Sequence, residues 1–256
     1  MGSRIRYHAI FVAILSLPAT LLGRQASSFG KPAEPIKVVL VGDSTVALQA
    51  GWGPGFCAHL IAPAKCLDLA ANGRSTKSYI DEGLWAKALQ AHGQFYFIQF
   101  GHNDQKTVPA LHTDPKTGFR SNLHRYVRDV RRIGGTPILV TSLSRRNYEG
   151  GKLIVDPLHD YAAATREVAA KDHVPLIDLY RLSRALLVPM TQQQADRYDG
   201  NTIDGVIARK PDRTHLNELG KKTFGDMVAR ATSRNVPALR PYIASEGTRT
   251  ESDNDR

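Results

Sequence analysis

The sequence predicts an α/β fold of three layers, with helices on both faces of about five parallel strands. Short apolar runs of strand length alternate along the chain with longer segments of helical periodicity. The apolar run that starts at Ile36 and stops before Gly42 is rich in β-branched residues, which is typical of a strand buried on both faces. Strands that alternate with helices are joined by crossover connections and therefore run parallel.

Each predicted element is bounded by residues that start or stop it. The glycine-rich stretch Gly51–Gly55 predicts a loop rather than a helix. Pro63 ends the first helix, Gly134 ends the third, and Pro157 begins the fourth. After the first strand, the predicted strands are Cys66–Leu69, Phe95–Phe100, Pro137–Thr141 and Val174–Leu179. The predicted helices are Phe56–Ala62, Tyr79–Gln90, Asn122–Ile133, Pro157–Lys171, Tyr180–Leu187 and Leu216–Ala231. The stretches predicted to lack regular structure include Thr107–Thr117, Ser142–Asp156 and Val188–Pro211.

Both ends of the chain are predicted to lie outside the domain, which we place at residues 29–236. Residues 1–28 have the pattern of a signal peptide: two arginines precede Ala9–Leu22, which is apolar but too short and interrupted for a membrane span. A cut after Gly23 or Ser28 predicts a secreted or periplasmic protein without stable membrane insertion, and a retained N-terminal anchor is the alternative. Residues 237–256 are polar and charged, which predicts a disordered tail.

The chain is basic, and its formal net charge of +10 falls to +7 when residues 1–28 are removed. A positive excess can attract nucleic acid, an anionic polysaccharide or a membrane surface. The sequence has no nucleic-acid-binding motif and no basic run interleaved with aromatic residues, so we expect no nucleic-acid partner. A solvated basic surface is the favoured explanation, so the net charge alone does not identify a partner.

Cys57 and Cys66 are the only cysteines. Export favours a disulfide between them, because oxidising compartments stabilise such bonds. A helix predicted in the intervening segment works against a bridge, so the sequence leaves both states open.

Ser44 follows the first strand directly, because Gly42 permits a sharp turn there. In open α/β sheets, ligands bind at the carboxyl ends of the strands, which is where this serine stands. The sequence Gly-Asp-Ser alone is also typical of a helix start, so a capping role is the alternative.

A serine nucleophile needs a base and a carboxylate that orients the base, and Asp212 and His215 stand together before the last predicted helix. Their spacing of three residues can place the carboxylate against one imidazole nitrogen and leave the other facing Ser44. The alternative is that Asp212 or Thr214 caps the last helix.

An acyl transfer also needs donors for the oxyanion. The main-chain N–H groups of Ser44 and Gly73 and the side-chain amide of Asn103 are candidates, since they follow the first three strands. Turn geometry explains Gly73 and Asn103 equally well. His102 and Asp104 have no third ligand at a suitable spacing, and no phosphate-binding or dinucleotide motif is present, so we expect no metal and no cofactor.

Four short stretches occur in the same order as in the SGNH (GDSL-type) hydrolases, and the chain from about Ile36 to Ala231 resembles that family. They are Gly42-Asp43-Ser44, Gly73 in Asn72-Gly73-Arg74-Ser75, Gly101-His102-Asn103-Asp104, and Asp212-x-x-His215. Their detail, together with Thr45, Gly51-Trp52-Gly53 and Gln99-Phe100, is most similar to the rhamnogalacturonan acetylesterase branch. Leu216 stands after His215 where phenylalanine is common, which does not touch the catalytic atoms.

The resemblance implies a flavodoxin-like sandwich and an esterase that removes acetyl groups from a plant-type polysaccharide, rhamnogalacturonan or another pectin. It implies that Ser44 is the nucleophile, that His215 is the base and that Asp212 orients the base. The oxyanion hole would comprise the Ser44 and Gly73 N–H groups and Asn103. The resemblance also implies that no metal takes part.

Thr45, Arg74 and His102 are the residues that we expect to contact substrate. Arg74 is a candidate for pairing with uronate carboxylates, because guanidinium and carboxylate groups match in geometry. We expect a monomer whose partner is the acetylated polysaccharide.

Two other functions use the same features. An esterase for short or medium acyl chains, or a lysophospholipase, would share the catalytic residues and have a more apolar cleft. A carbohydrate-binding protein on an inactive scaffold is disfavoured, because Ser44, Asp212 and His215 are all present. The loops at Thr107–Thr117 and Ser142–Asp156 shape the substrate cleft. The preference for acyl chain length distinguishes a polysaccharide acetylesterase from an esterase for longer acyl chains.

Overall fold

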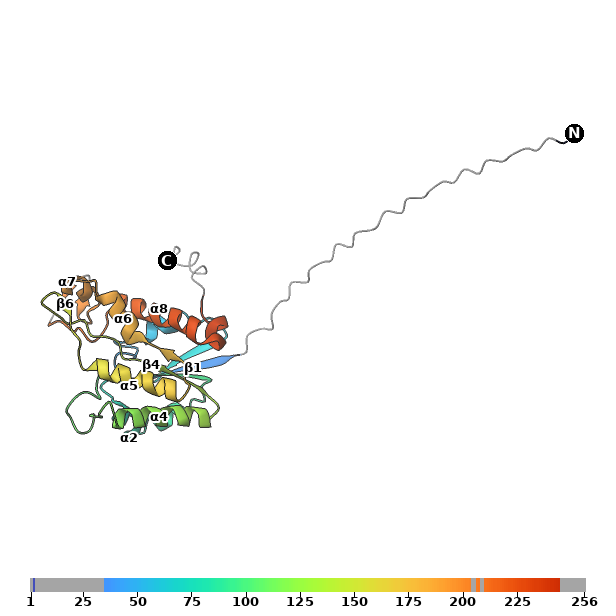
Figure 1. Cartoon of the computed structure of the whole chain (residues 1–256), viewed down its shortest axis with the longest axis horizontal. Coiled ribbons are helices and arrows are strands. Elements are labelled where there is room, and N and C mark those ends of the chain that lie inside the picture. Colours follow the sequence, from blue (N-terminus) through green and yellow to red (C-terminus); the bar gives the residue numbers. More distant parts are fainter. Residues whose placement is uncertain (1, 3–34, 204–205, 208–209, 245–256) are drawn as a thin grey trace. The chain divides into compact units, whose positions relative to one another are not determined.

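A parallel sheet of five strands forms the centre of the computed structural model, which describes residues 2, 35–203, 206–207 and 210–244 (Figure 1). The order across the sheet is β2-β1-β3-β4-β7, and every pairing is parallel. This order is the flavodoxin-like one, so the predicted fold class is confirmed. The strands are β1 (Ile36–Gly42), β2 (Ala64–Asp68), β3 (Phe95–Gln99), β4 (Thr136–Val140) and β7 (Leu176–Ile177).

Helices cover both faces of the sheet, as the upper and lower layers of Figure 1 show. Alternate residues of each central strand enter opposite cores: Leu40 and Phe97 pack in one, and Val39 and Ile98 in the other. The first core lies under α1 (Gly53–Cys57), α6 (Leu179–Leu187) and α8 (Glu218–Asn235). The second lies under α2 (Thr76–Asp81), α3 (Leu84–Leu89), α4 (Gly118–Arg132) and α5 (Leu158–Lys171).

Helix α1 includes glycines that were predicted to lie in a loop, so that prediction is wrong for Gly53–Gly55. The reason is the contact between α1 and α8. A Cβ atom on Gly55 would overlap the carbonyl oxygen of Lys221, and one on Gly225 would overlap the Gly55 backbone. The two helices therefore approach more closely than side chains would permit, and this packing outweighs the low helix propensity of glycine.

Other segments also differ from the predicted elements. The helix expected at Tyr79–Gln90 is divided into α2 and α3 at Gly83, which has a φ of 77°. The loop at Ser142–Asp156 contains a short hairpin, and the stretch Val188–Pro211 contains two short helices and a second hairpin. These elements are β5 (Tyr148–Glu149), β6 (Lys152–Leu153), α7 (Gln192–Ala195), η1 (Asp196–Tyr198), β8 (Thr202–Ile203) and β9 (Val206–Ile207).

The ordered domain continues beyond its predicted end. The 3₁₀-helix η2 (Pro237–Tyr242) buries Leu239 in the core shared with α8, and the Ala244 N–H donates to the carbonyl of His59 at 2.8 Å. The predicted tail is therefore wrong for residues 237–244, whose apolar side chains pack on the domain. Residues 245–256 lie outside the described residues, as does the predicted signal peptide except for Gly2.

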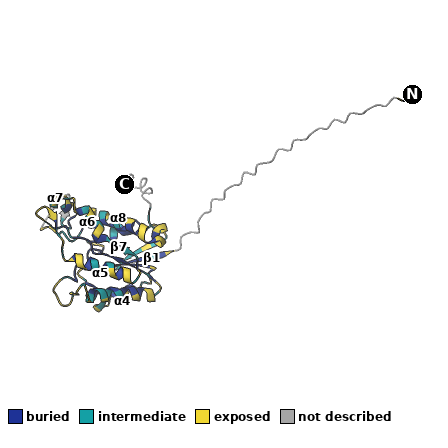
Figure 2. Ribbon diagram, in the orientation of Figure 1, coloured by how far each residue is buried: buried dark blue, intermediate teal, exposed yellow. Residues whose placement is uncertain are grey.

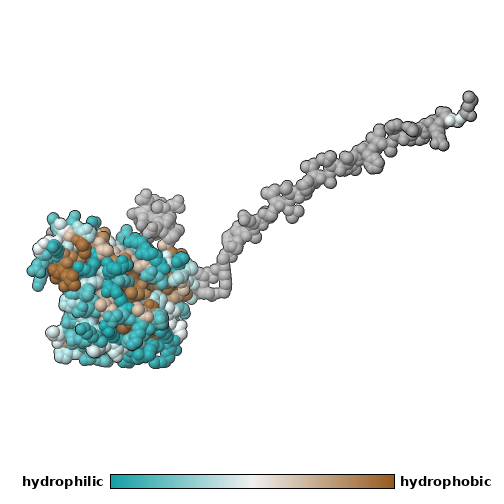
Figure 3. Space-filling view, in the orientation of Figure 1, coloured by the Kyte–Doolittle hydropathy of each residue, from teal (hydrophilic) through white to brown (hydrophobic). Residues whose placement is uncertain are grey.

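Cys57 and Cys66, whose state the sequence left open, form a disulfide that joins the end of α1 to β2, with 5.6 Å between their Cα atoms. Burial follows the layers: the central strands β1 and β3 are buried, and the outward faces of the helices are exposed (Figure 2). The visible face is mostly hydrophilic, and apolar side chains gather over the region of α7 and β6 (Figure 3). Among the described residues, no helix is long and apolar enough to cross a bilayer.

Candidate active site

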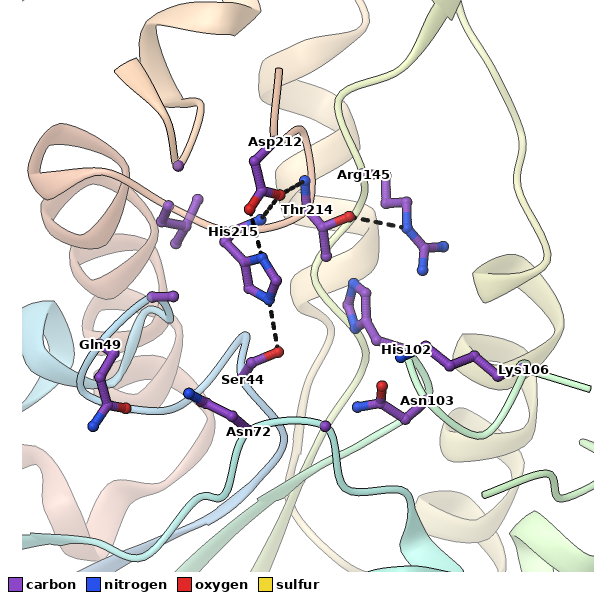
Figure 4. A pocket seen from close by; sticks show the side chains of 14 residues that line it. Ser44, Gln49, Asn72, His102, Asn103, Lys106, Arg145, Asp212, Thr214 and His215 are labelled. Atoms are coloured by element: carbon purple, nitrogen blue, oxygen red, sulfur yellow. Dashed lines mark hydrogen bonds and ion pairs between the residues drawn. The ribbon is translucent and has the colours of Figure 1, made fainter. Parts of the chain in front are cut away.

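The loops that follow β1, β2, β3 and β4 meet at the carboxyl edge of the sheet and enclose a hollow of about 510 Å³. Ser44, Gly73, Asn103 and Arg145 reach it from these four loops. The loop before α8 closes it from the other side with His215 and its neighbours (Figure 4). Parallel strands bring their carboxyl ends to one edge, so residues far apart in sequence become neighbours there.

Ser44 stands on a tight turn rather than at the start of a helix, so the capping alternative is not what the structure shows. The carbonyl of Asp43 accepts hydrogen bonds from the N–H groups of Val46 and Ala47, both at 3.1 Å. Glycine is needed just before the turn, because a Cβ atom on Gly42 would lie 2.5 Å from the Gln99 carbonyl oxygen. The serine side chain is nearly buried but faces the hollow.

A buried chain of hydrogen bonds holds this turn on the sheet. The Trp52 indole donates to Gln99 at 2.8 Å, the Gln99 amide donates to the Thr45 hydroxyl at 2.7 Å, and that hydroxyl donates to Asp43 at 2.7 Å. Thr45 is fully buried and does not line the hollow. Its predicted contact with substrate is therefore wrong: its hydroxyl is committed to supporting the nucleophile turn.

His215 lies between Ser44 and Asp212 in the geometry of a proton relay. Its Nε2 is 2.8 Å from the Ser44 hydroxyl, and its Nδ1 is 2.7 Å from Asp212 Oδ2. Burial alone would raise the pKa of Asp212, but hydrogen bonds from the His215 N–H and imidazole and from the Thr214 N–H outweigh it and hold that pKa below its usual value. The ionised carboxylate keeps the proton on Nδ1 and leaves Nε2 free to accept the serine proton.

The loop that carries Asp212 and His215 rests on a buried arginine. The Arg146 guanidinium is fully buried and donates to the carbonyl oxygens of both residues. On the same loop, the Asp212 N–H donates to the buried Asp199 carboxylate at 3.0 Å. The alternative that Asp212 or Thr214 caps α8 is not observed, since Asn217 caps that helix.

The predicted oxyanion donors face the same hollow. Within the described residues, the main-chain N–H groups of Ser44 and Gly73 have no hydrogen-bond acceptor. Gly73 has a φ of 77°, a conformation that favours glycine. The Asn103 amide donates to the Arg74 carbonyl at 3.0 Å, which fixes the side chain and leaves its second N–H. Figure 4 shows the Asn103 amide on the Ser44 side of the hollow. A carbonyl held at Ser44 would meet three donors of the kind that stabilise a tetrahedral oxyanion.

Of the remaining predicted contacts, His102 lines the hollow and Arg74 does not. Burial lowers the pKa of His102 well below its usual value, and the positive charge of Arg145 lowers it further, so the ring is neutral. The Arg74 guanidinium turns outward and pairs with Glu82 at 2.8 Å. The structure therefore places this side chain outside the hollow, beside an acid of its own loop–helix unit.

Lys106 and Arg145 line the hollow although the sequence did not single them out. Both stand in loops that follow strands, after β3 and β4, and that position was the available signal. The side-chain direction of Arg145 depends on a neighbour distant in sequence, the hydroxyl of Thr214. Among the described residues, no three His, Cys, Asp or Glu side chains converge in a way that could hold a metal ion.

Comparisons with known proteins identify the family of the chain and agree with its fold. The model of the GDSL-like lipase/acylhydrolase family matches residues 40–223. A probable rhamnogalacturonan acetylesterase of Bacillus subtilis is 31% identical over 202 residues, which cover 75% of this chain and 90% of that protein. A rhamnogalacturonan acetylesterase of the same organism is 30% identical over 230 residues, covering 83% and 96%. The crystal structure of a lipase/acylhydrolase from Enterococcus faecalis superposes with a TM-score of 0.57 at 20% identity over 78% of this chain and 96% of that one, which bears on the fold.

Proposed function

The chain belongs to the GDSL-like lipase/acylhydrolase family, and from that membership we propose that it is a serine esterase that removes acetyl groups from an acidic polysaccharide, rhamnogalacturonan in the first instance. The observation that carries the proposal is the relay itself: the Ser44 hydroxyl lies 2.8 Å from His215, whose other nitrogen lies 2.7 Å from Asp212. The two curated relatives named as rhamnogalacturonan acetylesterases support the substrate.

The reaction begins when the Ser44 hydroxyl attacks the acetyl carbonyl while His215 Nε2 takes its proton. Asp212 stabilises the imidazolium that forms. The oxyanion of the tetrahedral intermediate accepts hydrogen bonds from the N–H groups of Ser44 and Gly73 and from the Asn103 amide.

His215 then returns the proton to the sugar oxygen, which leaves as a free hydroxyl, and the acetyl group stays on Ser44. Water attacks this ester with His215 again as base, and acetate departs. Each step needs only the residues already assembled around the hollow.

The surroundings of the serine support a short acyl group and a polar alcohol. Gly73 and Ala50 line the hollow beside Ser44, and neutral polar side chains of Gln49 and Asn72 stand along it. A long acyl chain would need a continuous apolar wall, and few large apolar side chains line this hollow. Lipid esters are the second candidate, since the family includes lipases.

Acetate release from polymers tests the proposal. We expect faster release from acetylated rhamnogalacturonan than from acetylated xylan, a preference for acetyl over butyryl and longer aryl esters, and no release after chemical deacetylation. The Ser44→Ala protein is the matched control and should lose at least about a thousandfold in kcat. A preference for octanoyl esters without acetate from any polysaccharide would instead establish the lipid-ester function.

We also propose that the enzyme acts outside the cytoplasm. The basic start and the apolar stretch Ala9–Leu22 support export. N-terminal sequencing of the protein from the culture medium or periplasm should find a new terminus between Gly23 and Phe29, whereas an intact Met1 in the membrane fraction would identify a retained anchor.

A further inference from the structure

Two cations on one side of the hollow have no part in the proposed chemistry. Lys106 and Arg145 line the same hollow as Ser44 and His215, and Figure 4 shows them together on the side away from Gln49 and Asn72. We call this pair the cationic wall. The opposite side carries neutral amides, so the hollow is electrostatically asymmetric.

The negative charge available to the cationic wall is small. Asp212 is the one carboxylate among the described residues that line the hollow, and it is engaged with His215. The contact of Arg145 with Asp156 is a single one at 3.4 Å. By comparison, Arg166 binds Asp178 through two nitrogens, both at 2.9 Å. Arg145 is thus held in place while much of its hydrogen-bonding capacity stays available.

Arg145 is also positioned by the catalytic loop. Its Nε donates to the Thr214 hydroxyl at 3.3 Å, and Thr214 precedes His215 directly. A second hollow of about 560 Å³ shares Arg145, Asp212 and Thr214 with the first. The guanidinium therefore stands at the junction of the two hollows.

Lys106 contributes an exposed positive charge. Its main-chain N–H donates to the Asn103 carbonyl at 3.1 Å, which fixes its backbone beside the oxyanion donors. Within the described residues its ammonium group has no partner. The positive potential of the wall reaches buried groups, since the charge of Arg145 adds to burial in lowering the pKa of His102.

We propose that Lys106 and Arg145 bind a carboxylate of the substrate, carried by a uronate sugar of the same chain as the ester that is cleaved. This inference rests on the proposed polysaccharide esterase function, and it transfers to the cationic wall the role that the sequence analysis gave to Arg74. A compact ammonium and a planar guanidinium together suit a carboxylate that approaches from solvent. Neutral acetylated sugars would lack this contact.

Calorimetric binding to the full-length Ser44→Ala protein tests the proposal without any turnover. The probes are a galacturonate trisaccharide and a neutral galactose trisaccharide. We expect the acidic probe to bind more tightly, and Lys106→Glu to weaken it about three- to tenfold, because an exposed ion pair is modest and reversal adds repulsion. Raised salt should reduce the difference between the probes.

Lys171→Glu is the charge-matched control, since it makes the same change in net charge at the end of α5, where the chain returns toward the opposite edge of the sheet. Equal binding of both probes, or equal losses in Lys106→Glu and Lys171→Glu, would overturn the proposal. With Ser44 intact, the control Lys171→Glu should hydrolyse a neutral aryl acetate at the wild-type rate within about twofold, because Lys171 does not line the hollow.

Failure of the proposed function has a different signature. A wild-type protein that releases no acetate from any polysaccharide would refute that function, while the calorimetric comparison would still decide the carboxylate site. An enzyme that deacetylates polymers but binds both probes equally would keep the function and lose the cationic wall.

Discussion

Replacing Asp212 by asparagine separates the tasks of its two carboxylate oxygens. Oδ1 accepts the N–H groups of Thr214 at 3.2 Å and His215 at 3.1 Å, whereas Oδ2 faces His215 Nδ1 at 2.7 Å. An amide has only one acceptor oxygen. That oxygen must stay with the two main-chain donors, because an NH₂ group there would confront both of them. The NH₂ group is then left facing Nδ1.

The imidazole must respond by accepting at Nδ1, which moves its proton to Nε2. Nε2 then donates to the Ser44 hydroxyl instead of accepting from it, so the ring no longer acts as a base. We expect kcat to fall about ten-thousandfold, the loss typical of a triad histidine in the wrong tautomer. KM and folding should change little, because the main-chain hydrogen bonds of the loop are kept.

The assay is hydrolysis of a neutral aryl acetate, with thermal unfolding of the same samples to establish that the variant is folded. The double variant Ser44→Ala/Asp212→Asn should be no slower than Ser44→Ala alone within about threefold, since residues that act as a unit are not additive. A folded Asp212→Asn enzyme with more than a tenth of the wild-type kcat would refute the tautomer argument.

Three further predictions concern stability, each measured as the free energy of unfolding in urea. Arg146→Met should cost about 3–5 kcal/mol, because it removes the buried guanidinium that donates to the carbonyls of Asp212 and His215 and whose charge favours the nearby acids, and a loss below about 1 kcal/mol would contradict this. Gly55→Ala should cost about 3 kcal/mol or more through overlap with α8, whereas Gly134→Ala, with a φ of 79° and open space around it, should cost about 1 kcal/mol; equal costs would show that helix contact is unimportant. Burial raises the pKa of Asp104 to about 6, so the protonated carboxyl stabilises the fold fully below pH 4, and this stabilisation is lost as pH rises through 6. The free energy of unfolding should fall by about 3 kcal/mol over that range, and Asp104→Asn should remove the fall. Parallel pH profiles of the two proteins would contradict this.

The sequence by itself determined the layers of the fold and the chemistry of the site. The alternation of β-branched runs with helical segments is a local pattern, because each element must bury its own apolar face. The position of Ser44 after a strand, and of His215 before a helix, followed from the same local signals. Parallel strands then bring such loops to one edge whatever their separation along the chain.

The tertiary structure decided the outcomes that depend on competition between distant partners. Whether Arg74 or Arg145 faces the hollow depends on Glu82 taking the first and Thr214 orienting the second. The helix at Gly53–Cys57 and the ordered segment after residue 236 likewise exist because α8 and the first core receive them. Intrinsic helix propensities differ by about 1 kcal/mol per residue. Burying the apolar side chains of a few residues against a neighbouring element contributes more than this difference. Tertiary contacts therefore set these conformations.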